Sequence, residues 1–186
     1  MEKKINNKKI FIIIAVVFLI AIVTISIIII SNQAKWKDFE TCKTDKFEIK
    51  YNKNWTMTDD LSEFYGKKFV YENNKIEFYL MKKAELPTTR NTATKLKDET
   101  LKQLSNENME KLSQNSLVKY EVSKLDTQNV KVSGLDGYKI EFEISGIGGL
   151  SGALLYIEDD NYMYCMSLEG EDLETFNRMI ESIKIK

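Results

Sequence analysis

An unbroken apolar run from Ile10 to Ile30 is the longest hydrophobic pattern in the chain, and its only polar members are Thr24 and Ser26. At about 1.5 Å per residue, a helix over this run is about 31 Å long, close to the hydrocarbon thickness of a bilayer. Seventeen of its 21 residues are Ile, Val, Leu or Phe, and they favour insertion by on the order of 5 to 10 kcal/mol. The sequence therefore predicts one transmembrane helix over residues 10–30, in contact with membrane lipid.

The residues that flank this run indicate its orientation. A cleaved secretory signal has an apolar stretch of only about 7 to 15 residues before a small-residue cleavage site, and Asn32-Gln33-Ala34 is a poor match to such a site. Lysines are more numerous before the run than after it, so the positive-inside bias keeps the N-terminus in the cytoplasm; these are Lys3, Lys4, Lys8 and Lys9 before it and Lys35 and Lys37 after it. We expect a single-pass protein of the cell membrane with a cytoplasmic segment 1–9, a juxtamembrane linker 31–46 and one extracytoplasmic domain 47–186.

Alternation of apolar and polar residues predicts strands in the first part of this domain. Phe47–Tyr51 has the period of two that is typical of a strand with one buried face, and Trp55–Thr58 can begin a return strand. Phe69–Glu72 and Lys75–Met81 are expected to form a hairpin across Asn73-Asn74, a dipeptide that tolerates positive φ.

Two helices are predicted from the spacing of apolar residues. The first runs from Asn91 or Thr92 to about Ser116, and the four polar residues Ser105–Asn108 are the place where it could kink or break. The second is the C-terminal helix, whose apolar stripe is formed by Leu173, Phe176, Ile180 and Ile183.

Further strands are predicted between the two helices. One covers Val118–Ser123, and another covers Tyr138–Ile144 after a Gly134–Gly137 turn, with one face in the core and the other in water. Gly152–Glu158 and Tyr162–Leu168 form a last hairpin, and the second of these is apolar on both faces, as a covered central strand would be. The domain is thus predicted to be α+β, with an antiparallel sheet of about six to seven strands.

Composition excludes several classes of function. Removing residues 1–34, which hold four Lys and one Glu, leaves 23 basic and 27 acidic side chains and a net charge of −4. That balance argues against nucleic acid as a partner, because nucleic-acid binding needs a basic patch. The chain has no histidine, so the commonest general acid/base and metal ligand is missing. We expect no catalytic residues, no bound metal and no cofactor.

Three segments carry a resemblance to a known family: Phe47–Trp55, Val132–Tyr138 and Phe176–Ile185. Together they resemble the PsbP-like domain family over residues 47–186. The chain departs from the family pattern at Asn52 and Ile183, where proline and phenylalanine are common. The resemblance implies an α/β/α sandwich and carries over no catalytic residue. Because the plant member is an extrinsic accessory subunit of a membrane complex, and bacterial relatives are often anchored at the cell surface, it implies an accessory or binding role.

Two sequence features invite a site assignment but have simpler interpretations. The Gly-rich segment Gly146–Gly152 is followed by a predicted strand and lacks a lysine, whereas a phosphate-binding loop leads into a helix, so a hairpin connection is favoured. Cys42 and Cys165 could form one disulfide outside the cell, although Cys165 fits equally well as a small buried hydrophobic residue.

Aromatic, acidic and charged surface residues leave alternatives open. A set of aromatics could form a groove for a glycan or a peptide, but in alternating strands such residues mostly pack in the core; they are Tyr51, Trp55, Tyr65, Tyr71 and Tyr79. The acidic pairs Asp59-Asp60 and Asp159-Asp160 read as turns rather than a calcium site. The Lys/Glu-rich helix face from Lys95 to Lys111 is a solvated surface or a docking face.

These observations predict a membrane-tethered, non-catalytic binding or assembly module with a protein partner at the cell surface. The alternative is an envelope receptor for a small molecule or glycan, or an enzyme that uses carboxylates and tyrosines in a pocket. A third hypothesis is a subunit of a membrane machine whose transmembrane helix itself makes the specific contacts.

Overall fold

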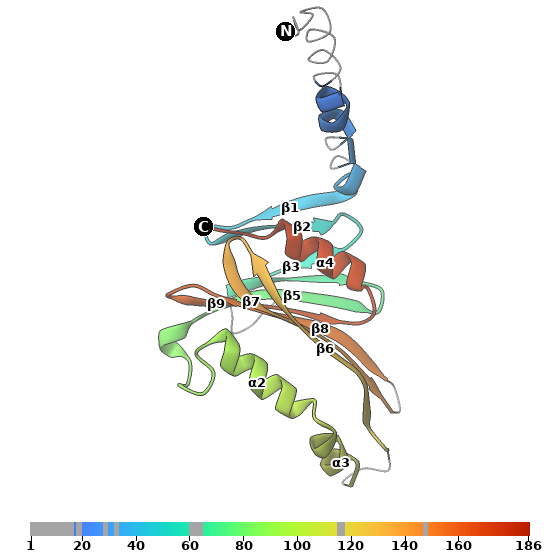
Figure 1. Cartoon of the computed structure of the whole chain (residues 1–186). Coiled ribbons are helices and arrows are strands. Elements are labelled where there is room, and N and C mark those ends of the chain that lie inside the picture. The colour runs from blue at the N-terminus through green and yellow to red at the C-terminus, as the bar shows by residue number, and fades with distance from the viewer. Residues whose placement is uncertain are drawn as a thin grey trace, which may run out of the picture. The chain divides into compact units, whose positions relative to one another are not determined.

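The computed structural model describes residues 17, 20–27, 30–31, 34–59, 65–114, 118–146 and 149–186 (Figure 1). The chain divides into two units, residues 1–39 and residues 40–186. Part of the predicted transmembrane helix over residues 10–30 lies outside the described residues. Among the residues that are described, no helix has both the length and the apolar character needed to cross a membrane.

The N-terminal unit exposes its aliphatic side chains. Residues 20–27 are helical, and seven aliphatic residues of the described part are 51–65% exposed: Val17, Ile20, Ile22, Val23, Ile25, Ile27 and Ile30. The hydroxyls of Thr24 and Ser26 each donate a 2.8 Å hydrogen bond to the carbonyl four residues earlier. Both polar side chains are therefore satisfied inside the helix itself.

The second unit is built on a seven-stranded antiparallel sheet with the strand order β3-β4-β5-β9-β8-β7-β6. This confirms the antiparallel sheet of about six to seven strands. Its strands are β3 (Thr56–Thr58), β4 (Tyr65–Tyr71), β5 (Asn74–Lys82), β6 (Glu121–Val132), β7 (Leu135–Ser145), β8 (Leu150–Glu158) and β9 (Tyr162–Glu169).

A second, three-stranded sheet has the order β1-β2-β10 and was not predicted from the sequence. It comprises β1 (Phe39–Lys43), β2 (Phe47–Asn52) and β10 (Lys184–Ile185). Strand β1 falls inside the range 31–46 that the sequence suggested as a linker. The expected return strand does form, as β3, but it pairs with β4 through Thr56 and Val70 instead of returning along β2.

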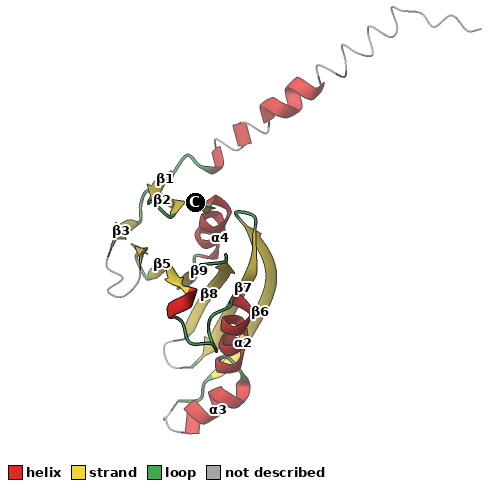
Figure 2. Cartoon of the chain, turned by 90° about the vertical axis from the view of Figure 1, so that its left-hand side faces the viewer, coloured by secondary structure: helices red, strands yellow, loops and turns green. Residues whose placement is uncertain are grey.

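Helices and the small sheet cover both faces of the large sheet. Figures 1 and 2 show α4 (Leu173–Ser182) beside the three-stranded sheet on one face of the large sheet, and α2 (Ala93–Gln103) across the opposite face. The short α3 (Asn106–Gln114) contacts β6, and a 3-10 turn, η1 (Lys83–Glu85), follows β5. The apolar stripe predicted for the C-terminal helix is confirmed at Phe176, Ile180 and Ile183, which are at most 9% exposed, whereas Leu173 is only half-buried. Met179, which the prediction left out, is also fully buried.

Strand β9 lies at the centre of the core. It pairs with β5 on one side and with β8 on the other. Four consecutive residues, Met163 to Met166, are at most 2% exposed, so both faces of the strand are covered. The prediction of a central strand covered on both sides is confirmed.

The β4–β5 hairpin forms as predicted, but its turn is one residue earlier. Tyr71 pairs with Asn74, which leaves Glu72 and Asn73 as the turn residues, with Glu72 at φ 51°. Asn74 is the first residue of β5, and its side-chain oxygen accepts hydrogen bonds from the backbone N–H groups of Glu171 and Asp172, at 2.8 and 3.0 Å. This residue therefore joins the hairpin to the start of α4.

The β6–β7 hairpin also differs from the sequence prediction. Val132 pairs with Leu135 across Ser133-Gly134, both of which have positive φ, so the predicted Gly134–Gly137 turn is wrong and Gly137 lies inside β7. Strand β6 is longer than the predicted Val118–Ser123 segment, because polar residues beyond Ser123 continue to pair with β7. An exposed edge strand does not need an apolar face along its whole length.

The predicted long helix is interrupted at the polar stretch where a break was expected. Helix α2 ends at Gln103 and α3 begins at Asn106. Ser105 stabilises the end of α2 and the start of α3. Its hydroxyl donates to the Lys102 carbonyl of α2 at 2.7 Å and accepts from the Asn108 N–H of α3 at 3.3 Å.

The predicted water-facing side of β7 is partly covered, which corrects the sequence interpretation. The side chains of Lys139 and Glu141 are only 12% and 14% exposed and form a 2.9 Å ion pair. Lys139 also donates to the Asn177 side chain of α4 at 3.1 Å, and Lys124 of β6 lies 3.4 Å from Glu141. A packed helix can thus cover polar positions when their charges are paired.

A glycine on β7 provides a test of how tightly this face is packed. A Cβ atom at Gly137 would lie 2.2 Å from the carbonyl oxygen of Tyr156 and 2.4 Å from a side-chain carbon of Ile157. We predict that Gly137→Ala lowers the free energy of unfolding by about 1–3 kcal/mol, because the strands must separate. Urea denaturation measures this, with Gly149→Ala as the control, since its nearest atom is 3.7 Å away. Equal losses in both variants would contradict the prediction.

Because of Glu141, we expect the free energy of unfolding to depend on pH in the acidic range. Burial raises its pKa, but Lys139 and Lys124 outweigh burial and hold the pKa of Glu141 below its ordinary value of 4.5. A carboxyl whose pKa is lower in the folded state stabilises the fold above its unfolded pKa, and this stability is lost as pH falls through the folded pKa. We therefore predict that Glu141→Gln costs about 1–3 kcal/mol at neutral pH and progressively less below about pH 4.5.

The measurement is urea denaturation of both proteins over a pH series from neutral to acidic. Glu143→Gln is the matched control, because Glu143 is 51% exposed and lies 3.8 Å from Lys124. A cost of Glu141→Gln that stays constant with pH would show that the charge of Glu141 is not the stabilising element.

Candidate functional site

One hollow of the second unit has aromatic rings on two sides, and we call it the aromatic groove. Its volume is about 410 Å³. It lies where the loop between β1 and β2 meets the start of β4, the end of β5, η1 and the start of β9. Its lining consists of Lys46, Tyr65, Leu80, Met81, Lys82, Glu85, Leu86 and Tyr162.

The first aromatic wall is Tyr65, whose ring is held at two points. Its ring lies edge-on to that of Phe47, with 6.4 Å between centroids, and its hydroxyl donates to the Asp45 carboxylate. That hydrogen bond is the main reason why the pKa of Asp45 lies below its ordinary value. Tyr65 is nevertheless 47% exposed, so a fixed aromatic surface faces solvent.

The second wall is Tyr162, which follows a tight turn organised by Asp159. The Asp159 carboxylate accepts from the N–H groups of Asn161 and Tyr162, both at 2.7 Å, and from the Tyr164 hydroxyl at 2.8 Å. Burial raises the pKa of Asp159, but these hydrogen bonds outweigh it and leave the pKa below its ordinary value. The acidic residue of this turn is thus used for local structure, as the sequence suggested.

The floor of the aromatic groove is apolar and its rim is charged. Leu80 is 7% exposed, and Met81 and Leu86 are half-buried. The Lys46 ammonium lies 5.4 Å from the centre of the Tyr162 ring, and Lys82 forms a 2.9 Å ion pair with Glu85 in which both side chains are more than 60% exposed. Such an exposed pair contributes little stability and exchanges readily with other partners.

A second hollow, about 680 Å³ in volume, is polar and acidic. It lies beside the β4–β5 turn and the segment before α4, and its carboxylates are Glu72, Glu143, Glu169 and Glu171. Lys75 lies 2.5 Å from Glu169, and Lys124 lies 3.8 Å from Glu143. Within the described residues, no three Asp, Glu, Cys or His side chains come together in a way that could hold a metal ion.

Of the five aromatics named from the sequence, the structure brings only Tyr65 to the aromatic groove. Tyr51 packs against Phe69 and Trp55 stacks on Tyr71, with ring centroids 5.1 and 6.0 Å apart. These contacts confirm that most of the set packs within the fold. Tyr162, the other wall, was missed as a site residue, since only its position directly after the Asp159-Asp160-Asn161 turn could have indicated it.

The remaining sequence candidates are structural. Gly152 allows close strand packing, because a Cβ there would lie 2.4 Å from the Leu168 carbonyl oxygen. The Gly-rich segment leads into β8, which supports a hairpin connection, and Ile147 and Gly148 lie outside the described residues. Asp59 forms an ion pair with Lys67, and Asp60 also lies outside the described residues.

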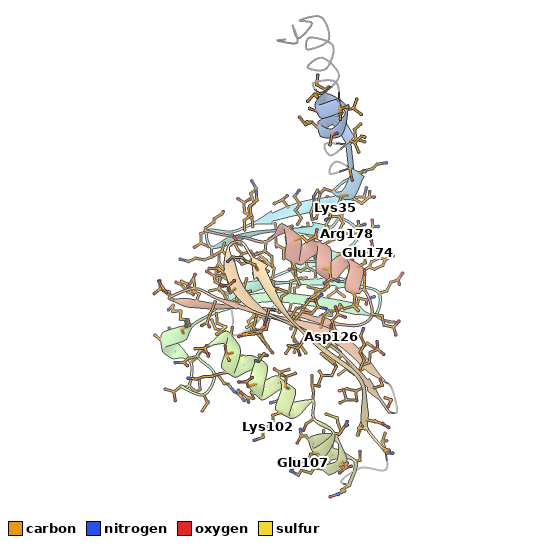
Figure 3. All side chains as sticks on the ribbon, viewed as in Figure 1. Lys35, Lys102, Glu107, Asp126, Glu174 and Arg178 are labelled. Carbon is orange, nitrogen blue, oxygen red and sulfur yellow. The ribbon has the colours of Figure 1, made fainter. Side chains whose placement is uncertain are left out.

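The charged helix face faces solvent along both helices. Lys102 of α2 and Glu107 of α3 point away from the sheet (Figure 3). Glu107 forms an exposed 2.6 Å ion pair with Lys111, and the Arg90 guanidinium pairs with Glu99. These are ordinary features of a solvated helix surface, which favours the simpler of the two sequence interpretations.

The largest upward pKa shifts belong to core residues and not to a cleft. Burial raises the pKa of Tyr79 and Tyr164, and it raises the pKa of the Cys165 thiol to about 12. Glu141, the carboxylate most enclosed by ion pairs, has a lowered pKa, whereas a general acid at neutral pH needs a raised one.

Cys42 and Cys165 are free thiols in this structure, so the disulfide considered from the sequence is not formed in it. Cys42 is on β1 of the small sheet and Cys165 is on β9 of the large sheet, and each is at most 5% exposed. Burial raises the pKa of both thiols.

Buried thiols of high pKa should react very slowly, because the thiolate is the reactive species. We predict that the native protein gives almost no reaction with Ellman's reagent at about pH 8, and that both cysteines react once the chain is unfolded in guanidinium. Cys42→Ser and Cys165→Ser variants assign the two signals. Fast labelling of the native protein, or recovery of fewer than two thiols after unfolding without reductant, would contradict this expectation.

Comparison with known proteins identifies the fold. No family model matches the chain, and no curated protein matches its sequence. The solution structure of cyanobacterial PsbP (CyanoP) from Synechocystis superposes with a TM-score of 0.52 and 11% sequence identity, covering 80% of this chain and 93% of that chain. At this identity the similarity shows the fold alone. The family resemblance seen in the sequence is therefore confirmed at the level of architecture, and the chain has a PsbP-like fold.

Proposed function

We propose that this chain is a single-pass membrane protein whose PsbP-like domain lies outside the cytoplasm and acts as a non-catalytic binding or assembly module. The observation that carries the proposal is the exposed aliphatic surface of the N-terminal unit, where seven Ile and Val side chains are 51–65% exposed. A surface of this kind on a soluble domain normally marks an interaction site. Here it belongs to an unbroken apolar run of 21 residues, which suits lipid.

Hydrogen bonding within this helix supports the tether. A side chain inside a bilayer cannot hydrogen-bond to water, so its polar groups need partners within the protein. Thr24 and Ser26 both bond to carbonyls one turn earlier in the same helix. The lysines before the run favour a cytoplasmic N-terminus, which directs the domain to the other side.

A binding role for the domain is supported by the distribution of its titratable groups. The strongly shifted groups Tyr79, Tyr164 and Cys165 take their shifts from core burial, and the chain has no histidine. The aromatic groove combines apolar surface with a charged rim, in which Lys82 and Glu85 pair with each other. The PsbP-like fold is compatible with such a role, because the plant member of that family is an accessory subunit of a membrane complex.

We predict that the full-length chain resists carbonate extraction from membranes, and that protease added to spheroplasts degrades a C-terminal tag. Replacing Ile20 and Val23 with Lys together costs about 5 to 7 kcal/mol of insertion free energy. This offsets most of the free energy that favours insertion, so carbonate should extract a larger fraction of this variant. The matched control is the double replacement by Leu. A wild-type chain that carbonate extracts, or a tag that stays protected until the cells are lysed, would contradict the proposed tether or its orientation.

Crosslinking in native membranes tests the assembly role. We expect the full-length protein to retain a discrete protein partner, and the partner should also be retained by a chain whose residues 10–30 are replaced with an unrelated transmembrane helix. Loss of the partner on that replacement would show that the membrane helix, and not the domain, makes the specific contacts. Recovery of no partner with either chain would contradict an assembly module.

A further inference from the structure

The aromatic groove carries a more specific inference, which rests on the proposed binding function and names the chemistry of the partner. Its two tyrosines are positioned before any ligand arrives. The Tyr65 ring contacts Phe47 and its hydroxyl bonds to Asp45. The backbone of Tyr162 is held by the Asp159 turn, and its ring lies 6.3 Å from that of Tyr164. Rigid aromatic surfaces bind with little loss of conformational entropy. A partially exposed tyrosine fixed in this way is better suited to contact with a partner than to closing the core.

The residues at the floor of the aromatic groove indicate what kind of ligand group it binds. Leu80 lies on β5, between the strands that carry the two rings, and pairs with Tyr65. Met81 and Leu86 also line the groove but pack against the buried cluster that contains Met163 and Cys165. The lining contains no Asn, Gln, Ser or Thr side chain among the described residues. A sugar ring needs several polar groups to satisfy its hydroxyls. An aliphatic or aromatic side chain needs none, so the composition of the floor favours a peptide over a glycan.

The charged residues at the rim of the groove indicate that the ligand carries a negative charge beside its apolar side chain. The lining supplies the two ammonium groups of Lys46 and Lys82 and the carboxylate of Glu85. The Asp45 carboxylate, which accepts the Tyr65 hydroxyl, lies beside this rim and is already engaged by that bond. Among the described residues, no carboxylate oxygen lies within ion-pair distance of the Lys46 ammonium, which lies 5.4 Å from the centre of the Tyr162 ring. The Lys82–Glu85 pair is exposed and can be replaced by a ligand carboxylate at little cost.

We propose that the aromatic groove binds an extended peptide segment of a partner protein, in which an aromatic or aliphatic side chain stands next to acidic residues. The apolar side chain lies between Tyr65 and Tyr162 on the aliphatic floor. The neighbouring carboxylates contact Lys46 and Lys82. A volume of about 410 Å³ is at the small end of the range for ligand pockets, which suits one side chain with its flanking backbone.

The test uses the purified full-length chain in detergent and a fluorescein-labelled peptide with an Asp-Phe-Glu core between Gly-Ser spacers. Fluorescence anisotropy should show saturable binding that weakens as NaCl rises from about 0.05 M to about 0.5 M. Peptides with an Asn-Phe-Gln core or an Asp-Ser-Glu core should each bind about tenfold more weakly, because the first lacks the charge and the second lacks the ring.

Variants of the protein locate the site. Tyr65→Ala and Lys46→Glu should each weaken binding about tenfold. Tyr71→Ala is the matched aromatic control, since Tyr71 is 39% exposed on the same strand but outside the groove. Lys131→Glu is the matched charge control, because Lys131 is 66% exposed on the β6 edge. Thermal unfolding confirms that all four variants fold.

Three results would overturn the proposal: no binding of the Asp-Phe-Glu peptide to the wild-type chain, equal binding by the groove and control variants, or displacement of the peptide by a tetramer of N-acetylglucosamine. The third would identify the groove as a glycan site. Each of these measurements is independent of membrane topology and of a native partner. A failed proposal for the groove is therefore distinguishable from a failed tether or assembly role.

Discussion

Burial of β9 on both faces is the constraint on which the rest of the domain depends. A strand with apolar side chains in both directions is stable only if each face of the sheet has a cover. Helix α2 covers one face, where Cys165 and Met163 pack with Ala93. On the other face the cover is composite: Phe176 and Met179 of α4 are fully buried, as are Phe47 and Ile49 of β2. The three-stranded sheet exists because one helix is too narrow to cover seven strands.

This composite cover explains the polar contacts that join distant parts of the chain. The Ser182 hydroxyl accepts the N–H of Lys50 at 2.8 Å, and the Ile185 N–H donates to the Ser133 hydroxyl at 2.9 Å. These bonds hold the end of α4 and β10 to the small sheet and to the β6–β7 hairpin. Buried or half-buried backbone groups at such junctions need a partner, and serine hydroxyls provide it. The aromatic groove forms at one such junction, where the β1–β2 loop, which supplies Lys46, meets the large sheet.

Local patterns in the sequence were sufficient to predict most of the large sheet. Alternation identified β2, β7 and the β8–β9 hairpin, and a polar stretch marked the break between α2 and α3. The three-stranded sheet was missed for a different reason: β10 is only two residues long and pairs with a strand more than 130 positions earlier, through Lys184 and Glu48. A pairing that is decided by tertiary packing leaves no periodicity to detect.

The candidate site was less predictable than the fold for the same reason. Tyr65 could be singled out as an exposed aromatic, but the groove also needs Lys46 and Tyr162, which are far apart in sequence and meet only when the two sheets meet. The covered ion pair of Lys139 and Glu141 was hidden too, since alternation predicts which face a residue occupies and not what later packs on that face.

The position of β1 has a mechanical consequence. It is the edge strand of the small sheet and the first element of the domain to follow the N-terminal segment. Any tension carried by that segment reaches β1 and its pairing with β2 before it reaches the strands around β9. Since β2 also pairs with β10, which directly follows α4, a pull on the N-terminal segment acts on the three-stranded sheet and the end of α4 before it acts on the seven strands of the large sheet.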